Sequence, residues 1–269
     1  MSILRAFNTG VNMNREEQLA AKKLEYEGKV YPTNRCGDVV VVEYIASNRV
    51  LIRFLNTNNE MFVGMSALRK GLIKDKAQIT TCNYGIIDID GASMGDVMTR
   101  EYYLWNNMIN RCYNEKSLIK SPNYMKCGVD ERWKYLSAFK EWCNNQIGFE
   151  QEGWALDKDI LVKGNKVYSP ETCCFVPVEI NCALTNNKKV RGEFPQGVIW
   201  NSNKTRYRAR IQRKNKWESL GTYDTPEEAF YVYKPIKEAY IRYLAGIWRD
   251  KIDPRVYEAL MNWTIEITD

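Results

Sequence analysis

The chain has 269 residues, of which 45% are hydrophobic and 27% charged, which is typical of a globular protein with room for about two or three small domains. It contains no histidine, so chemistry that needs an imidazole as general base or metal ligand is excluded. The net charge of +6 is mildly basic, and no apolar run approaches the roughly 20 residues of a membrane span. We therefore expect a cytoplasmic protein, without a signal peptide and without a membrane partner.

The cysteines do not form a recognisable metal or disulfide pattern. No two of them are spaced as C-x-x-C, and no histidine is present to complete a mixed site. They are spread over the chain at Cys36, Cys82, Cys112, Cys127, Cys143, Cys173, Cys174 and Cys182. We expect reduced, mostly buried thiols and no zinc site.

Residues 1–27 are predicted to be a polar lead-in that contains a short helix. In "NREEQLAAKKLE", Asn14 is the expected N-cap, and glutamates follow in the first turn. From residue 28 to residue 76, β-branched runs alternate with turns such as "ASN" and "NTNN". We interpret this segment as a small β-barrel of about five strands. Such barrels often bind peptides or nucleic acids, but the fold alone does not assign a function.

Residues 77–187 are predicted to form a helical domain that ends in short strands and a helix. The weakly patterned segment before Thr99 is expected to be a loop. "REYYLWNNMINRCYN" and "DERWKYLSAFKEWCNNQ" then repeat aromatic and apolar residues at helical spacing, which is typical of core-facing helices. "WALDKDILVKGNKVYSPETCCFVPVEIN" (154–181) indicates one strand, a turn at Gly164-Asn165, a second strand ending at Tyr168, and a helix after Pro177.

Residues 188–195 are expected to be a linker, and residues 196–269 a sheet-plus-helix domain. The runs "GVIW", "RYRARIQR" and "WESLGTY" are predicted strands separated by turns. A long helix should follow, with Asp224 or Thr225 as its N-cap, and Pro235 should kink or divide it. Its apolar face is predicted to consist of Ala229, Val232, Ile236, Ala239, Tyr240, Tyr243 and Leu244. A further short helix is expected near the end of the chain.

The predicted strand "RYRARIQR" carries a basic surface. Because successive side chains of a strand alternate, Tyr207, Ala209 and Ile211 should pack on the helix, and the other face should carry arginines. Residues 196–217 contain no acid, so this block favours a polyanionic partner, double-stranded DNA first, over a plainly solvated face. The candidate DNA contacts are Lys204, Arg206, Arg208, Arg210, Gln212, Arg213, Lys214, Lys216 and Trp217.

Residues 197–245 resemble the DNA-binding domain of plant ethylene-response factors. The matching runs are "GV" at 197–198, "YRARI" at 207–211, "LGTY" at 220–223 and "EA" at 228–229. The resemblance implies a three-stranded sheet that packs on one helix and lies in the major groove of DNA. Ile199 stands where the family often has a DNA-contacting arginine, so the base sequence read can differ. The same module also occurs in mobile nucleases of phages and bacteria.

Residues 154–181 resemble the ββα-metal core of HNH endonucleases, and the resemblance extends over residues 102–187. It implies catalytic roles for Asp157, Lys158 and Asn165. It also implies a Mg²⁺ or Mn²⁺ site on Asp157 and Asn181. Lys158 stands where the family has its general-base histidine. A lysine could act as a base only if burial or a nearby cation lowered its pKa, whereas a charged lysine could steady a phosphate.

Three interpretations of this segment stay open. It is a metal-dependent nuclease with a modified site, an inactive nuclease scaffold used for DNA binding, or an unrelated segment in which Asp157 and Lys158 form a surface ion pair.

The whole sequence is interpreted as an α+β multidomain protein related to phage-encoded HNH homing endonucleases. We expect it to bind double-stranded DNA, and either to nick or cut that DNA with a divalent metal or to act as an inactive DNA-binding regulator. A further hypothesis is a phage effector that binds a host protein through the N-terminal barrel. If phage-encoded, the protein would act in the cytoplasm of a bacterial host.

Overall fold

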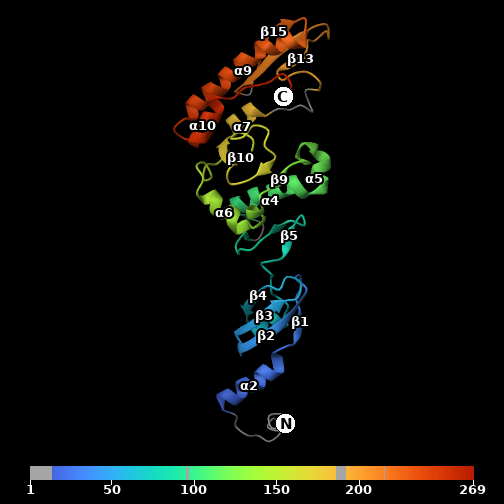
Figure 1. The fold of residues 1–269 in the computed structure, drawn as a ribbon, viewed down its shortest axis with the longest axis vertical. Coiled ribbons are helices and arrows are strands. Elements are labelled where there is room, and N and C mark those ends of the chain that lie inside the picture. The colour runs from blue at the N-terminus through green and yellow to red at the C-terminus, as the bar shows by residue number, and fades with distance from the viewer. Residues whose placement is uncertain (1–13, 95–96, 186–191, 215) are drawn as a thin grey trace. The chain divides into compact units, whose positions relative to one another are not determined.

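The computed structural model of the protein describes residues 14–94, 97–185, 192–214 and 216–269. Helices and several small sheets alternate along the chain, which confirms the α+β class (Figure 1). The structure divides into two compact units. The first ends at Val97 and also includes Tyr135–Ser137, and the second comprises Met98–Lys134 and Ala138–Asp269. No helix in the described ranges is long and apolar enough to cross a bilayer.

The first described helix, α2 (Arg15–Tyr26), begins at its predicted N-cap. The Asn14 side chain accepts a hydrogen bond from the backbone N–H of Glu17 at 2.9 Å. The Glu17 carboxylate accepts one from the backbone N–H of Asn14, also at 2.9 Å. These reciprocal bonds satisfy N–H groups that a helix start otherwise leaves unpaired, so the local sequence fixes where α2 begins.

The N-terminal sheet is open, and the predicted barrel over residues 28–76 is wrong. Its antiparallel strands, in chain order, are β1 (Val30–Pro32), β2 (Asp38–Ala46), β3 (Arg49–Phe54) and β4 (Glu60–Val63). In place of a fifth strand, the short helix α3 (Met65–Arg69) buries Met65 and Leu68 against the core of the sheet. At the other edge, Pro32 in β1 has no N–H to offer a further strand. Within the described residues, both edges therefore stay unpaired.

The rest of the first unit consists of short ladders where a loop is predicted. The pairs are β5 (Ile79–Thr81) with β6 (Gly85–Ile86), and β7 (Ser93–Met94) with β8 (Val97–Met98). Ile86 also forms a bridge to Tyr135, and the Asp88 carboxylate accepts a bond from the Ser137 N–H at 2.9 Å. These contacts join Tyr135–Ser137 to the first unit.

Helices from the middle of the chain begin the second unit. The elements are α4 (Arg100–Tyr113), α5 (Glu115–Lys120), η1 (Pro122–Tyr124), β9 (Gly128–Val129), η2 (Glu131–Lys134) and α6 (Leu136–Asn144). Thr99 caps α4 near the predicted start, and the predicted core residues Trp105 and Trp133 are almost fully buried. The Trp105 indole donates to the Trp133 carbonyl at 2.7 Å, so this aromatic core also satisfies its polar atom.

The segment that resembles HNH nucleases forms β10 (Trp154–Asp157), β11 (Val167–Tyr168), β12 (Cys174–Pro177) and α7 (Val178–Leu184). The helix after Pro177 is confirmed. The antiparallel partner of β10, however, is β12 and not the strand that ends at Tyr168. That strand, β11, pairs in parallel with β9 instead. A hairpin of β10 and β12 followed by α7 therefore gives a ββα order with a long loop between its strands.

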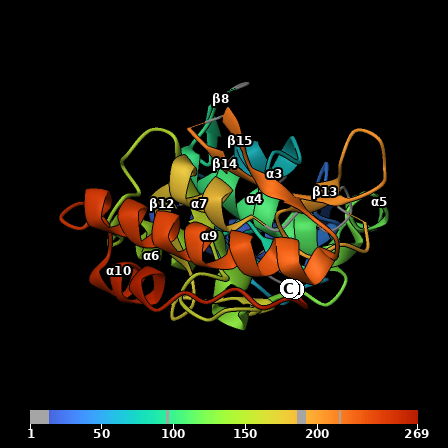
Figure 2. The ribbon, with the colours of Figure 1, turned by 90° about the horizontal axis from the view of Figure 1, so that it is seen from above.

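The C-terminal sheet has the predicted order of strands. It consists of β13 (Val198–Trp200), β14 (Tyr207–Arg213) and β15 (Lys216–Tyr223), all antiparallel. Helix α9 (Pro226–Trp248) packs along this sheet, and α10 (Pro254–Met261) packs against α9 (Figure 2). Thr225 is the N-cap of α9, and its side chain accepts a bond from the Glu228 N–H at 3.2 Å. Residues 188–191 of the expected linker lie outside the described residues.

Helix α9 is undivided, and its buried face differs from the predicted one. It continues through Pro235, so the proline does not divide it. Its buried face is also rotated from the predicted one, because Ala239 and Tyr243 are exposed. The residues that α9 does bury are Ala229, Phe230, Tyr233, Lys237, Tyr240, Ile241, Leu244 and Ala245. A lysine therefore lies on the face that packs against the rest of the unit.

The ββα unit and the C-terminal sheet share one hydrophobic core. Val176 of β12 and Ile180 of α7 belong to the same buried cluster as Ala209 and Ile211 of β14. The rings of Trp154 and Trp248 also meet edge to face, 5.9 Å apart. Side chains from α7, the sheet and α9 can therefore line one site.

All eight cysteine thiols are free, and six of them are buried. Burial raises the pKa of Cys112 and of Cys173 to about 12. Such thiols stay protonated at neutral pH and are poor nucleophiles. The expectation of mostly buried cysteines is confirmed.

Candidate functional site

Strand β14 separates an apolar face from a basic one. Ala209 and Ile211 are buried against α9, as predicted from the alternation. Arg208, Arg210 and Gln212 occupy the alternate positions and point to the outer face. Arg206 precedes the strand and forms an ion pair with Asp224 at 2.7 Å.

The neighbouring strands extend this outer face sideways. Arg208 lies opposite Ile199 of β13 and Thr222 of β15, while Gln212 lies opposite Trp217. Residues directly opposite in antiparallel strands share a face of the sheet. The outer face therefore combines cationic, polar and apolar side chains.

The guanidinium groups of Arg208 and Arg210 have no acidic partner among the described residues. Arg210 instead lies over the ring of Trp217, with its guanidinium carbon 4.0 Å from the ring centroid. Trp217 is 57% exposed. A guanidinium stacked on an exposed indole keeps its N–H edges free for an anion.

The other candidate DNA contacts lie outside this central pair. Arg213 lies near Glu218, with its guanidinium nitrogen 3.6 Å from the carboxylate oxygen. Exposed lysines lie at both ends of β14: Lys204 in the turn before it, and Lys214 and Lys216 after it. Lys204 and Lys214 adopt left-handed backbone conformations, with φ of 51° and 48°. The lysines extend the positive surface along the strand direction.

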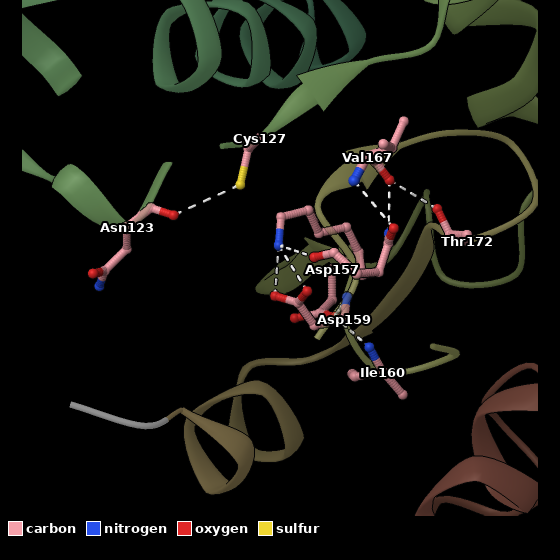
Figure 3. Close-up of polar contacts among 9 residues, drawn as sticks. Asn123, Cys127, Asp157, Asp159, Ile160, Val167 and Thr172 are labelled. Carbon is pink, nitrogen blue, oxygen red and sulfur yellow. Dashed lines mark hydrogen bonds and ion pairs between the residues drawn. The ribbon is translucent and has the colours of Figure 1, made fainter. Parts of the chain in front are cut away.

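Asp157 ends β10 and holds the turn that follows. Its Oδ1 atom accepts hydrogen bonds from the backbone N–H groups of Asp159, at 2.7 Å, and Ile160, at 2.9 Å (Figure 3). Burial raises the pKa of Asp157, although these backbone bonds oppose the shift. The carboxylate therefore acts here as the cap of a turn.

Lys158 is buried and fully partnered. Only 5% of the residue is exposed. Its Nζ atom donates to both carboxylate oxygens of Asp159 at 2.7 Å and to the backbone oxygen of Asn165 at 3.0 Å. These bonds use the three N–H donors of a lysine ammonium, so the group is not free to bind a phosphate in this arrangement. The ion pair of this segment is Lys158–Asp159, in place of the surface pair with Asp157.

Asn165 closes the same loop from the other side. Its Nδ2 atom donates to the backbone oxygens of Lys158 at 2.8 Å and Val167 at 2.7 Å. Its Oδ1 atom accepts a bond from the Val167 N–H at 3.1 Å. Thr172 donates a further bond to Val167, at 3.0 Å (Figure 3). Asn165 lies in the turn, as the resemblance implies, and it serves to hold the backbone there.

One donor predicted for Mg²⁺ or Mn²⁺ is partly used within the protein, and the metal site stays a prediction from the resemblance. These ions prefer several oxygen ligands, and one Asp157 oxygen is already used by two backbone N–H groups. Asn181 lies in α7, and its backbone oxygen accepts a bond from Thr185. In the part of the chain that the structure describes, no group of three or more Cys, Asp or Glu residues is placed to hold a metal ion.

Comparisons of the chain with models of protein families, with curated proteins and with solved structures find no match. The functional argument therefore depends on the geometry of the residues themselves.

Sequence reasoning missed a cavity beside the C-terminal sheet. It has a volume of about 710 Å³, and Lys237 of α9 lines it together with side chains from α7 and from the sheet. The signal was present in the sequence, because Phe230, Tyr233, Lys237 and Tyr240 recur at helical spacing. This spacing places a lysine within an aromatic stripe.

Proposed function

We propose that the protein binds double-stranded DNA through the outer face of the β13–β15 sheet. The observation that carries this proposal is the pair Arg208 and Arg210, which share one face of β14 and have no acidic partner among the described residues. Two guanidinium groups on one strand repel each other unless an anion lies across them. A DNA backbone or the edges of its guanines supply such partners.

The composition of the outer face supports groove binding. The major groove of B-DNA admits a β-ribbon, and arginines can bond guanine O6 and N7 there. Ile199, which lies beside Arg208 on the sheet, offers an apolar surface of the kind that contacts a thymine methyl group. The lysines at both ends of β14 are placed to neutralise phosphates.

The loop at Asp157 favours a structural role of the ββα unit over DNA cleavage. The Asp157 carboxylate caps a turn, and all three donors of Lys158 are used within the loop. The resemblance to HNH nucleases is thus better accounted for by a scaffold that supports the DNA-binding sheet through the shared core. Metal-dependent cleavage stays a prediction from the resemblance alone.

DNA binding is tested by fluorescence anisotropy with a labelled duplex of mixed sequence. The double variant Arg208→Ala, Arg210→Ala should weaken DNA binding by about tenfold or more, because each of the two substitutions removes a charged hydrogen-bond donor. The double variant Arg242→Ala, Arg249→Ala is the matched control, since it removes the same charge from the same unit outside the outer face of the sheet. Equal losses in both variants would reject the sheet face as the binding surface.

Cleavage is tested separately with supercoiled plasmid and Mg²⁺ or Mn²⁺. We expect no conversion to nicked or linear DNA by the wild-type protein. Nicking that disappears in Asp157→Ala, with DNA binding intact, would contradict the scaffold role and restore the nuclease.

A further inference from the structure

The cavity beside the C-terminal sheet has the size and lining of a ligand site. Its volume of about 710 Å³ lies within the range of roughly 300–1,000 Å³ that small-molecule pockets occupy. Helix α7 forms one wall, side chains from β13–β15 such as Ile199, Arg210 and Gln212 a second, and α9 a third. All three belong to the same compact unit and the same hydrophobic core.

Lys237 is the unusual group in this cavity. Only 7% of the residue is exposed, and its Nζ atom lies 6.0 Å from the centroid of the Tyr240 ring. Among the described residues it forms neither an ion pair nor a hydrogen bond. Residues 186–191 contain no Asp or Glu that could neutralise it. Burial, with a smaller effect from the charge of Arg213, lowers the pKa of Lys237 to about 8. A buried amine without an acidic partner costs stability, which is expected where the amine binds a ligand.

The remaining lining favours an anion with an aromatic part. Arg210 and Lys214 add positive charge, and Trp217, Tyr233 and Tyr240 supply ring surfaces. Among the described residues, Glu179 is the carboxylate that lines the cavity, and burial, together with the charge of Glu179, raises the pKa of Tyr240. Glu179 forms no ion pair with Lys237 in the described structure. Cations beside aromatic rings are the combination that binds nucleotides, through the phosphate and the base.

We propose that the cavity binds a nucleotide, with its phosphate on Lys237 and its base against the aromatic wall. The nucleotide is either a free mononucleotide or one unit of a bound DNA strand, since both present the same phosphate and base. Arg210 and Trp217 belong to both the cavity and the outer face of the sheet. A free nucleotide in the cavity would therefore compete with duplex DNA, a consequence that rests on the proposed DNA binding.

Isothermal titration calorimetry of the full chain with AMP, ATP and adenosine tests the site. AMP and ATP should bind, and adenosine, which lacks the phosphate, should bind at least about tenfold more weakly. Lys237→Met should weaken AMP binding by about tenfold or more, while Lys237→Arg should retain most of it. Arg242→Met is the matched control, because it removes a charge from α9 outside the cavity, and it should leave AMP affinity unchanged.

A second experiment, which measures the affinity of the same variants for labelled duplex DNA, shows whether the nucleotide is free or belongs to a DNA strand. If AMP does not bind but Lys237→Met weakens DNA binding more than Arg242→Met does, the phosphate comes from DNA. If neither ligand distinguishes the two variants, or if AMP and adenosine bind equally, the proposal is wrong.

Failure of the site and failure of DNA binding are distinguishable. Arg208 does not line the cavity, so Arg208→Ala should reduce DNA affinity without changing AMP affinity. A protein that binds AMP but no DNA would retain the cavity site and lose the proposed function. Melting temperatures should show Lys237→Met to be at least as stable as the wild type, so that lost binding cannot be attributed to unfolding.

Discussion

Two buried lysines of this protein have opposite surroundings. Lys158, in the loop after β10, donates all its N–H groups to Asp159 and to a backbone oxygen. Lys237, in α9, has no such partner in the described structure and lines a cavity. Lys158, for which the resemblance to HNH nucleases implies a catalytic role, is thus held by bonds within its own loop. Lys237, which lies in an aromatic stripe of α9, is the lysine that we propose to bind a ligand.

Replacing Lys158 should have the largest effect on stability. Lys158→Met removes the partner of Asp159 and the bond to the Asn165 backbone, which should lower the free energy of unfolding by about 2–3 kcal/mol. The estimate is below that for a fully buried pair because the Asp159 side chain is 45% exposed. Urea denaturation measures the change. A variant as stable as the wild type would mean that Lys158 does not tie the loop.

Replacing Lys237 should change the free energy of unfolding in the opposite direction. Lys237→Met removes a buried charge without an acidic partner and should raise the free energy of unfolding at pH 7 by about 1–2 kcal/mol. Urea denaturation alongside Arg242→Met provides the comparison. If Lys237→Met destabilises as strongly as Lys158→Met, Lys237 has a structural partner and the contrast between the two lysines fails.

The pH dependence of stability sharpens this contrast. Lys237 has a pKa of about 8 in the folded protein, below its ordinary value of 10.5. Between these pH values the unfolded chain binds a proton that the folded chain does not, so Lys237 makes stability rise with pH in this window. The wild type should therefore gain stability relative to Lys237→Met as the pH rises from about 8 towards 10. A constant difference between the two proteins across this window would contradict the burial of an unpartnered amine.

The smallest expected change in stability comes from replacing Asp157, and two variants distinguish its role as a hydrogen-bond acceptor from its charge. Asp157→Ala removes the acceptor of two backbone bonds and should cost about 1–2 kcal/mol. Asp157→Asn keeps an oxygen acceptor and removes a charge that burial disfavours, so it should cost less than Asp157→Ala. Thermal unfolding of the pair measures the difference. Equal losses in the two variants would assign the role to the charge and would favour a bound cation.

Features that depend on near neighbours in the chain could be predicted from the sequence. The cap at Asn14, the helix that begins near Thr99, and the alternation at Ala209 and Ile211 follow from the sequence pattern, and the structure confirms them. Closure of the N-terminal sheet could not be predicted, because it depends on whether the chain after Gly64 continues as a strand or turns into α3. Both choices place apolar residues against the core.

The surroundings of the two lysines depend on contacts that spacing does not encode. Lys158 bonds Asp159, its neighbour in sequence, and also the backbone oxygen of Asn165, seven residues further along the chain. The cavity at Lys237 needs α7 and the C-terminal sheet to share a core, although a linker is predicted between them. A helical wheel centred on Phe230 would have placed Lys237 on the buried face, but not beside a cavity.

The salt dependence of duplex affinity tests the central claim, that the outer face of the C-terminal sheet binds DNA, most directly. In a plot of log affinity against log salt, each phosphate contact adds about 0.9 to the steepness of the slope. The wild type should show a steep slope. The double variant Arg208→Ala, Arg210→Ala should reduce its steepness by the contribution of up to about two phosphate contacts. The double variant Arg242→Ala, Arg249→Ala should leave the slope unchanged. A slope near zero for the wild type, or one that both double variants flatten equally, would contradict DNA binding by this face.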